Sequence, residues 1–471
     1  MAKINSNKID SQILIPIYND YLKIYLKCDE VSVSNLNLMG ILFHELMFIA
    51  SSLVYKSVWK IEEQFIYPFV GYRKNKYKDQ NLMFRVSNKK FLTSLLNHVK
   101  IRNKNRLGIV NPGLNISSFI KLLNKNKIKF TFINKARLEI PEFEKQLNEI
   151  YSGLIEIFSK YNLQINLNTL INSIRVSFEK YKNFKRHDCE MIITGSPVNI
   201  PARIIAADAL SKNIPVLCID HGNETGTEDN PAWGYDEQSF CTHFLGFGEY
   251  GKEVIKNSHF MHPLHGKRPK YFSSSSPTIK NIFKTKEIVN FPENIKKCKL
   301  AYVPNKLMGI NRLGPFLSIS DSDYIDWQRA LLSAFPNIVY KAHPKEKVQK
   351  SLRNENITKK PLEECMDYFD VFIIDNAVST SFANLASTNK PIIYFNIGIG
   401  NLTLSAERSI KERVMWIDID ITKKTDLFSL VSCSNGKKYY NNHTQRFSLS
   451  KNEQSRESKS LEIIKSIFNH V

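Results

Sequence analysis

Paired cysteines are absent from this sequence. Its seven cysteines lie far apart, none forms a Cys-x-x-Cys pair, and an odd number cannot all be joined in disulfides. These facts exclude a disulfide scaffold like those of small secreted proteins, and they argue against a structural zinc site. We therefore expect a protein of a reducing compartment that binds no metal and no other cofactor.

The sequence also lacks a clean membrane span and a secretory signal. Its most hydrophobic segment, residues 36–55, carries His44 and Glu45 near the middle, which a membrane-spanning helix would resist. The first twenty residues contain no apolar core of the kind that a signal peptide needs. We expect a buried helix at 36–55 and a cytoplasmic protein, which its basic charge could bring into peripheral contact with the inner membrane.

Acidic residues are few relative to basic ones. There are 66 Lys and Arg against 45 Asp and Glu, a net charge of +21. An excess of this size favours an anionic partner, such as nucleotide phosphates, nucleic acid or a membrane surface. A general bias towards Lys and Asn, visible in "LLNKNKIKF", is the competing explanation. Because the basic residues are spread out and no RNA- or DNA-reading motif occurs, we expect no specific nucleic-acid partner.

A chain of 471 residues is long enough for two or three domains. Residues 1–100 predict a helical N-terminal region. Residues 101–265 alternate short apolar runs, such as Leu107–Val110, with helical patterns, which predicts a Rossmann-like domain with a parallel sheet. Residues 266–296 are basic, serine-rich and interrupted by prolines, as in a linker. Residues 297–471 repeat the strand–helix alternation, so the predicted fold class is α/β, with two Rossmann-like domains facing a cleft.

The stretch "NIVYKAHPKE", residues 337–346, ends an expected strand with a cation, an imidazole and a proline. Lys341 and His343 leave the strand on the same face, because side chains alternate along extended chain. Pro344 can begin the next helix at its first position. Since ligands bind outside the carboxyl ends of parallel strands, a lysine and a histidine here suit a diphosphate. The alternative is a capping loop with a surface lysine.

A second polar cluster follows the expected strand "VFIID". Ser379, Thr380 and Ser381 fall near the start of a helix, where backbone N–H groups and the helix dipole attract anions. Hydroxyls add further donors, so this position predicts a phosphate site. An ordinary N-cap is the alternative, although it would account for one hydroxyl and not for three.

The third cluster, "IDHGNETGTEDN", follows a strand in the first half. His221 comes directly after that strand, and Gly222 permits unusual backbone angles. The imidazole, or a carboxylate such as Glu224 or Asp229, could take a proton from an attacking hydroxyl. Asn223 would lie in the same cleft. The alternative for each carboxylate is a solvated acidic loop.

Taken together, these three motifs resemble the GT-B glycosyltransferases of bacterial surface polysaccharide synthesis. Two groups are the most similar: the CDP-glycerol glycerophosphotransferases of teichoic acid synthesis, and the capsule and lipopolysaccharide transferases that use CMP-activated Kdo or sialic-acid-like sugars. The resemblance covers about residues 105–400 in layout. It implies that Lys341, His343 and Pro344 face the donor phosphate and nucleotide.

The resemblance further implies that Thr380 and Ser381 hold phosphate at a helix start, and that His221 and Gly222 lie in the catalytic cleft. Those families usually have an acidic residue a few positions after the paired hydroxyls, where this sequence has Asn384. This difference at position 384 would affect the contact with the ribose or the base, and with it the type of donor.

The activity implied is that of a metal-independent, inverting glycosyltransferase. It would move a sugar from a CMP-sugar donor to a glycan or lipid-linked glycan acceptor. Lys341, His343 and the helix start would stabilise the charge that grows on the leaving phosphate. Three alternatives stay open: a CDP-polyol phosphotransferase of the teichoic-acid type, a nucleotide-sugar epimerase, and a non-enzymatic basic protein that binds nucleic acid.

Overall fold

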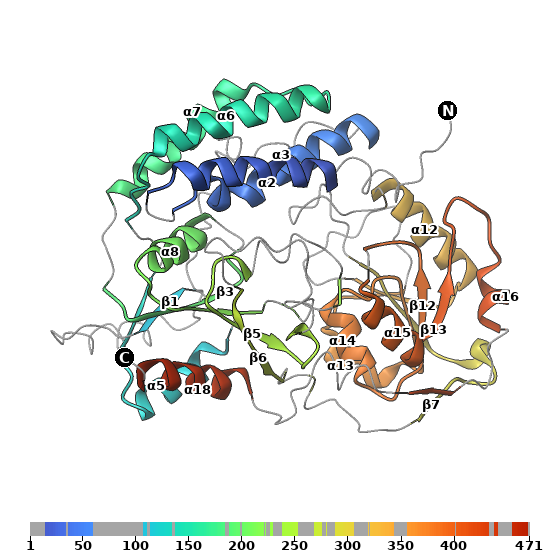
Figure 1. The fold of residues 1–471 in the computed structure, drawn as a ribbon. Helices are drawn as coiled ribbons and strands as arrows, with labels where there is room; N and C mark the ends of the chain where they lie inside the picture. The colour runs from blue at the N-terminus through green and yellow to red at the C-terminus, as the bar shows by residue number, and fades with distance from the viewer. Residues whose placement is uncertain are drawn as a thin grey trace.

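The structure of the chain is a computed structural model. The residues that it describes are 15–33, 36–59, 107–110, 114–133, 137–183, 188–197, 200–220, 222, 227–228, 238–252, 268–275, 279, 288–305, 319, 321–342, 356–400, 402–432, 438–440 and 455–469. Within them, two six-stranded sheets lie side by side, each between layers of helices (Figure 1). A short antiparallel ribbon joins β7 (Ile288–Asn290) to β14 (Lys438–Tyr440).

The N-terminal sheet has the strand order β2-β1-β3-β4-β5-β6, and every neighbouring pair is parallel. Its strands are β1 (Leu107–Val110), β2 (Phe130–Phe132), β3 (Met191–Gly195), β4 (Val216–Ile219), β5 (His243–Phe247) and β6 (Lys270–Ser274). The apolar runs "LGIV" and "VLCI" are buried at every position. Such runs form strands that are covered on both faces, so the strand expected at Leu107–Val110 is confirmed.

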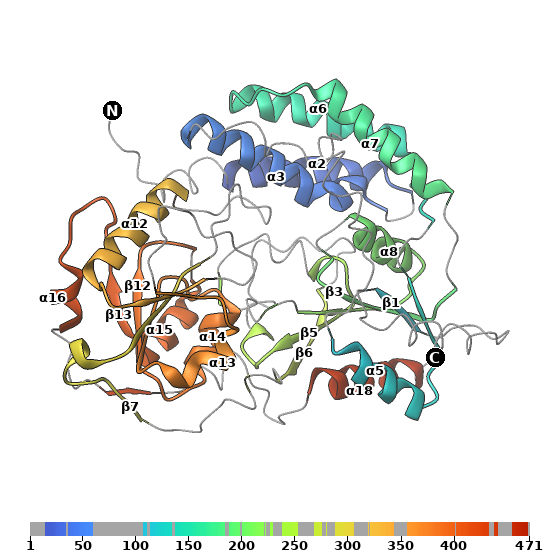
Figure 2. The same ribbon diagram turned by 180° about the vertical axis from the view of Figure 1, so that it is seen from behind.

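Helices cover the two faces of this sheet differently (Figures 1 and 2). On one face, α5 (Ile116–Lys125) and α18 (Arg456–Asn469) lie side by side and share an apolar core with β1, β3 and β4. On the other face, α8 (Ile200–Ser211) packs on β3 and β4, and further helices stack above it. These are α2 (Ile15–Val31), α3 (Leu38–Trp59), α6 (Phe143–Lys160) and α7 (Leu167–Lys182).

Helix α3 corresponds to the hydrophobic segment 36–55, and it lies inside this stack in contact with α2, α6 and α8. Its buried Glu45 forms an ion pair with Arg203 of α8, which is itself only 1% exposed. The expectation of a buried helix is therefore confirmed. Among the described residues, no helix has both the length and the apolar character needed to cross a membrane.

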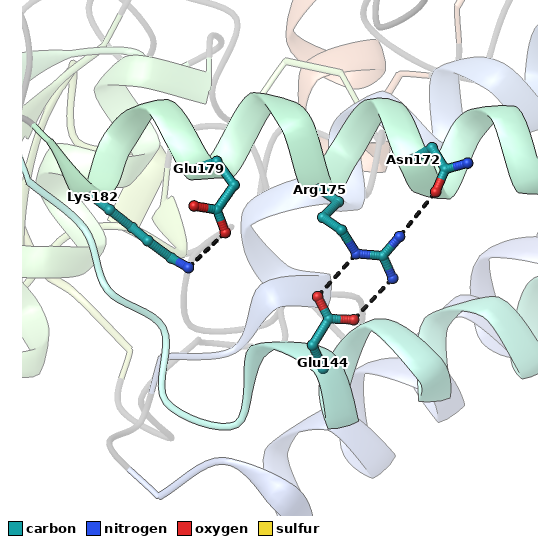
Figure 3. Close-up of polar contacts among 5 residues, drawn as sticks. All are labelled: Glu144, Asn172, Arg175, Glu179 and Lys182. Carbon is teal, nitrogen blue, oxygen red and sulfur yellow. Dashed lines mark hydrogen bonds and ion pairs between the residues drawn. The ribbon is translucent and has the colours of Figure 1, made fainter.

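The outermost helices, α6 and α7, are joined by paired charges (Figure 3). Arg175 donates from Nε and Nη2 to the two carboxylate oxygens of Glu144, at 2.9 Å each. Its Nη1 reaches Asn172 Oδ1 at 2.9 Å, and Lys182 pairs with Glu179 on the same helix. Exposed pairs add little stability, but the bidentate geometry fixes the position of α7 on α6.

The C-terminal sheet has the order β10-β9-β8-β11-β12-β13 and is also entirely parallel. Its strands are β8 (Leu300–Val303), β9 (Val339–Lys341), β10 (Ile357–Thr358), β11 (Val371–Ile374), β12 (Ile392–Asn396) and β13 (Met415–Asp418). Counted within this domain, that is the order 3-2-1-4-5-6 of the Rossmann fold. The chain changes its direction of growth between the neighbouring strands β8 and β11.

Helices again cover both faces of the C-terminal sheet. One face packs on α12 (Asp321–Ala334) and α16 (Leu427–Ser432). The other packs on α13 (Leu362–Cys365), α14 (Thr380–Ala386) and α15 (Leu404–Arg413). The predicted fold class, α/β with two Rossmann-like domains, is confirmed by these two sheets. Of the N-terminal region 1–100 that was expected to be helical, α2 and α3 are helices, and residues 60–100 lie outside the described part of the chain.

Two segments lie elsewhere than the sequence indicated. Helix α18, expected within the C-terminal domain at 297–471, packs instead on α5 and the N-terminal sheet. Residues 266–296 were expected to form a linker, but they include β6, the edge strand of the N-terminal sheet, and β7 of the small ribbon. The chain thus crosses between the domains twice, once after β6 and once before α18.

Candidate functional site

The carboxyl ends of β8 and β11 mark the switch point of the C-terminal sheet, which is where open parallel sheets bind ligands. The residue after β11, Asp375, is fully buried there. Its carboxylate accepts hydrogen bonds from Tyr302 of β8, from Tyr324 Oη at 3.0 Å and from Trp327 Nε1 at 3.0 Å. The backbone N–H of Asn305 lies 3.4 Å from the other oxygen. One carboxylate therefore ties together β8, α12 and the loop after β8.

Asp375 is surrounded by neutral donors, and burial raises its pKa above the ordinary range. The indole of Trp327 and the N–H of Asn305 can only donate, so the carboxyl group serves as an acceptor for them. We interpret Asp375 and its hydrogen-bond donors as a rigid cluster that fixes the backbone at the switch point. The sequence reasoning missed it, although an acid directly after the apolar run "VFII" was a visible signal.

The three hydroxyls at the start of α14 have different surroundings. Ser379 is the N-cap, and its Oγ accepts from Phe382 N at 3.0 Å. Thr380 is exposed, and its Oγ1 donates to the carbonyl of Gly222 at 3.4 Å. Ser381 is half-buried. One hydroxyl is thus used in capping, and the next one reaches the other domain.

The contact between Thr380 and Gly222 belongs to a wider junction between the two domains. Thr403 N, at the start of α15, donates to Thr227 O at 3.0 Å. Glu228 forms an antiparallel bridge with Leu402. Loops that follow β4 of the first sheet therefore meet loops that follow β11 and β12 of the second. The carboxyl ends of the strands in both sheets therefore face the junction between the two domains.

The backbone conformation of Gly400 and its lack of a side chain suit this junction. Its φ of +71° is one that L side chains rarely adopt, and a Cβ there would lie 3.3 Å from Glu228 Oε1. A side chain at position 400 would be strained and would crowd the Glu228 carboxylate. The glycine lets the acidic loop of the N-terminal domain approach the C-terminal domain closely.

Lys341 lies at the end of β9 with only 5% of its surface exposed. Its Nζ donates to the carbonyl of Ala342 at 2.9 Å. Burial lowers its pKa, while the nearby Cys365 and Glu363 of α13 act in the opposite direction. The ammonium group is therefore enclosed within the domain and hydrogen-bonded to the backbone.

Asn384, which stands where the resembling families have an acid, is buried on α14. Its Nδ2 donates to Glu363 Oε1 at 2.7 Å, and its Oδ1 has no hydrogen-bond partner among the described residues. A carboxylate thus reaches this point from α13 instead of from α14. Sequence reasoning could not find Glu363, because the two residues come from different helices.

Several predicted site residues lie outside the described part of the chain. They are His221, Asn223, Glu224, Asp229, His343 and Pro344. Their proposed roles stay predictions. Gly222, Lys341, Ser379, Thr380 and Ser381 are described, and of these the structure joins Gly222 and Thr380 directly.

Comparisons with known proteins give matches in structure alone. No family model matches the chain, and no curated protein matches it. It is similar to UDP-GlcNAc 2-epimerase from Neisseria meningitidis bound to UDP-GlcNAc, at 11% identity and a TM-score of 0.35, over 77% of this chain and 99% of that one. It is also similar to a UDP-N-acetylglucosamine 2-epimerase, at 9% identity and a TM-score of 0.36, over 79% of this chain and 96% of that one.

Proposed function

We propose that this protein is a glycosyltransferase that takes a sugar from a cytidine-nucleotide donor and passes it to a bacterial surface glycan. The observation that carries the proposal is the contact of Thr380 with Gly222, which joins the expected phosphate-binding helix start to the loop of the expected base. Donor phosphate at the edge of the C-terminal sheet and acceptor at the edge of the N-terminal sheet would then lie next to each other.

In this proposal the loop after β4 supplies the base. His221, or Glu224 or Asp229, would deprotonate the acceptor hydroxyl. His343 and Ser381 would contact the leaving phosphate, and the O–H of Thr380, which donates to Gly222 in the structure, would turn to that phosphate when the donor binds. Because Lys341 is buried, its part would be to raise the electrostatic potential at the end of β9 without touching the phosphate.

Release of CMP from CMP-sialic acid and from CMP-Kdo, measured with and without a surface-glycan acceptor, tests this assignment. We expect release that depends on the acceptor, and a loss of at least about tenfold in Thr380→Val, since removing one positioned donor commonly has an effect of that size or more. Thr169→Val replaces an exposed threonine in the first turn of α7 and should leave turnover unchanged. Equal turnover in both variants would contradict a role for Thr380.

A nucleotide-sugar epimerase, the class of both solved structures named above, is the second candidate. The junction at Thr380 and Gly222 would close a site over one substrate as readily as over two. Conversion of UDP-GlcNAc without any acceptor would establish this activity and exclude transfer as the main reaction. Consumption of CDP-glycerol would instead indicate the polyol-phosphate type of transferase.

A further inference from the structure

The segment from α5 to β2 carries charge of one sign. Residues 114–133 contain four lysines and no acidic residue. All four are exposed: Lys121, Lys125, Lys127 and Lys129. Lys121 and Lys125 are four residues apart on α5 and so lie on one face of the helix. Like charges at this spacing weaken a helix, so helix stability does not explain them.

The neighbouring helix α18 adds to this surface. It has three basic and two acidic residues, so the two segments together have a net charge of +5. Both acids are already occupied: Glu462 pairs with Lys459 at 2.6 Å, and Glu457 accepts from Asn115 N at 3.2 Å. Lys465 is exposed on the same helix. Little negative charge is left to balance the lysines of α5.

The opposite face of the same domain is built differently. Helices α2, α3, α6 and α7 carry eight basic and eight acidic residues. Many of these are paired, as Arg175 is with Glu144 and Lys182 is with Glu179 (Figure 3). Among the described helices on the two faces of the N-terminal sheet, those on one face are therefore basic, and the stacked helices on the other are neutral.

Apolar residues alternate with lysines along the chain that leads into β2. Phe132, at the end of the edge strand β2, is 43% exposed, and Phe130 and Ile128 are partly exposed. Lys127 and Lys129 precede the edge strand β2, where lysines discourage strand pairing with another molecule. That role does not account for the helical pair Lys121 and Lys125, nor for the exposed Phe132 on β2.

We infer that the surface formed by α5, β2 and α18 binds an anionic phospholipid membrane. Helical lysines supply the attraction to lipid phosphates, and Phe132 supplies an apolar contact at the interface. Nucleic acids are usually bound by arginine side chains and by aromatic rings that stack on the bases. Lysines on two adjacent helices therefore suit a lipid surface better. None of the residues changed in the test below belongs to the proposed active site, and the test needs no assumption about the reaction.

Vesicle flotation with the full chain tests this inference. We expect binding to vesicles of phosphatidylglycerol and phosphatidylcholine, and none to phosphatidylcholine alone. In Lys121→Gln/Lys125→Gln the partition coefficient should fall about 25-fold, because each lysine near an anionic surface contributes about fivefold. The matched control Lys27→Gln/Lys180→Gln removes the same charge from exposed positions on α2 and α7 and should change binding less than about twofold.

Four outcomes would overturn the inference. They are no binding to anionic vesicles, equal binding to neutral ones, unchanged binding in the α5 variant, and an equal loss in both variants. The four lysines that the two variants replace are all exposed. The melting temperatures of both variants should therefore match that of the parent protein. If vesicles fail and single-stranded RNA binds in a manner sensitive to salt and to the α5 variant, the surface serves nucleic acid instead.

Discussion

The two domains bury charge in different ways. In the N-terminal domain, Glu45 and Arg203 neutralise each other between α3 and α8. In the C-terminal domain, Asp375 and Arg413 are both fully buried, and their partners are neutral dipoles instead of each other. The first arrangement fixes how helices stack. The second fixes the ends of strands and helices, where a binding site would be formed.

Arg413 shows this second arrangement at the other end of α14. It donates from Nε to Ala386 O at 2.9 Å, and from Nη2 to Thr388 O at 2.7 Å and Lys390 O at 3.0 Å. These carbonyls lie at the end of α14 and in the turn after it. Burial lowers the pKa of Arg413 to about 9. Helix α14 is therefore held at its start by Ser379 and at its end by a buried guanidinium.

Breaking the ion pair should have the largest effect. Glu45→Leu leaves a buried guanidinium without its partner and should lower the free energy of unfolding by about 3–5 kcal/mol. Urea denaturation measures the loss. The double variant Glu45→Leu/Arg203→Met should recover most of it, because replacing both charges by apolar groups is often neutral. A double variant as unstable as the single one would show that the charges do more than compensate each other.

Arg413→Met should have the next largest effect. It should lower the free energy of unfolding by about 3 kcal/mol, because buried carbonyls at the end of α14 lose their donors. The same denaturation experiment applies. Arg408→Met, an exposed arginine elsewhere on α15, is the control and should change stability by less than about 0.5 kcal/mol. If Arg413→Met were as stable as this control, the guanidinium would not be holding α14.

Asp375→Asn should have a smaller effect, about 2 kcal/mol, since the amide keeps one acceptor but turns an N–H group towards other donors. Trp327 reports on it directly, so its fluorescence should shift in the folded state. Asp367→Asn, at an exposed position on the same domain, should change neither signal. If stability and emission were both unchanged in Asp375→Asn, Asp375 would not be holding the switch point in place.

The smallest effect concerns pH and Lys341. Because burial lowers its pKa, the folded protein binds fewer protons than the unfolded chain between that lowered pKa and the ordinary value of 10.5. Stability should therefore rise with pH through this window, and Lys341→Met should flatten the slope. Lys359→Met, at an exposed neighbouring position, should preserve it. Identical slopes in the two variants would mean that Lys341 is charged to the same extent in both states.

The sequence predicts the central strands well because they are short apolar runs covered on both faces. The strand "VFIID", residues 371–375, was expected, and Val371–Ile374 is found. Edge strand β6, "KYFSS", was missed because three of its five residues are polar and only the last is buried. Its place in the sheet depends on pairing with β5, which no local pattern reveals.

The candidate site was only partly predictable for the same reason. The hydroxyls at 379–381 and Gly222 come from local motifs, and their contact could be guessed from the carboxyl-edge rule. The Asp375 cluster joins side chains from three separate elements, and Glu363 meets Asn384 across two helices. Helix α18 has an amphipathic pattern, but this pattern does not say which of two cores its apolar side will join.

Thermal-shift measurements against CMP, CDP, UDP, GDP and ADP, without metal, test the central claim most directly. A nucleotide that binds the native state raises the melting temperature by mass action. We predict stabilisation by CMP or CDP, and a smaller shift in Thr380→Val than in Thr169→Val. CMP would indicate a sugar donor, and CDP a polyol-phosphate donor. A melting temperature that no nucleotide changes would contradict the assignment of a nucleotide site to the C-terminal domain.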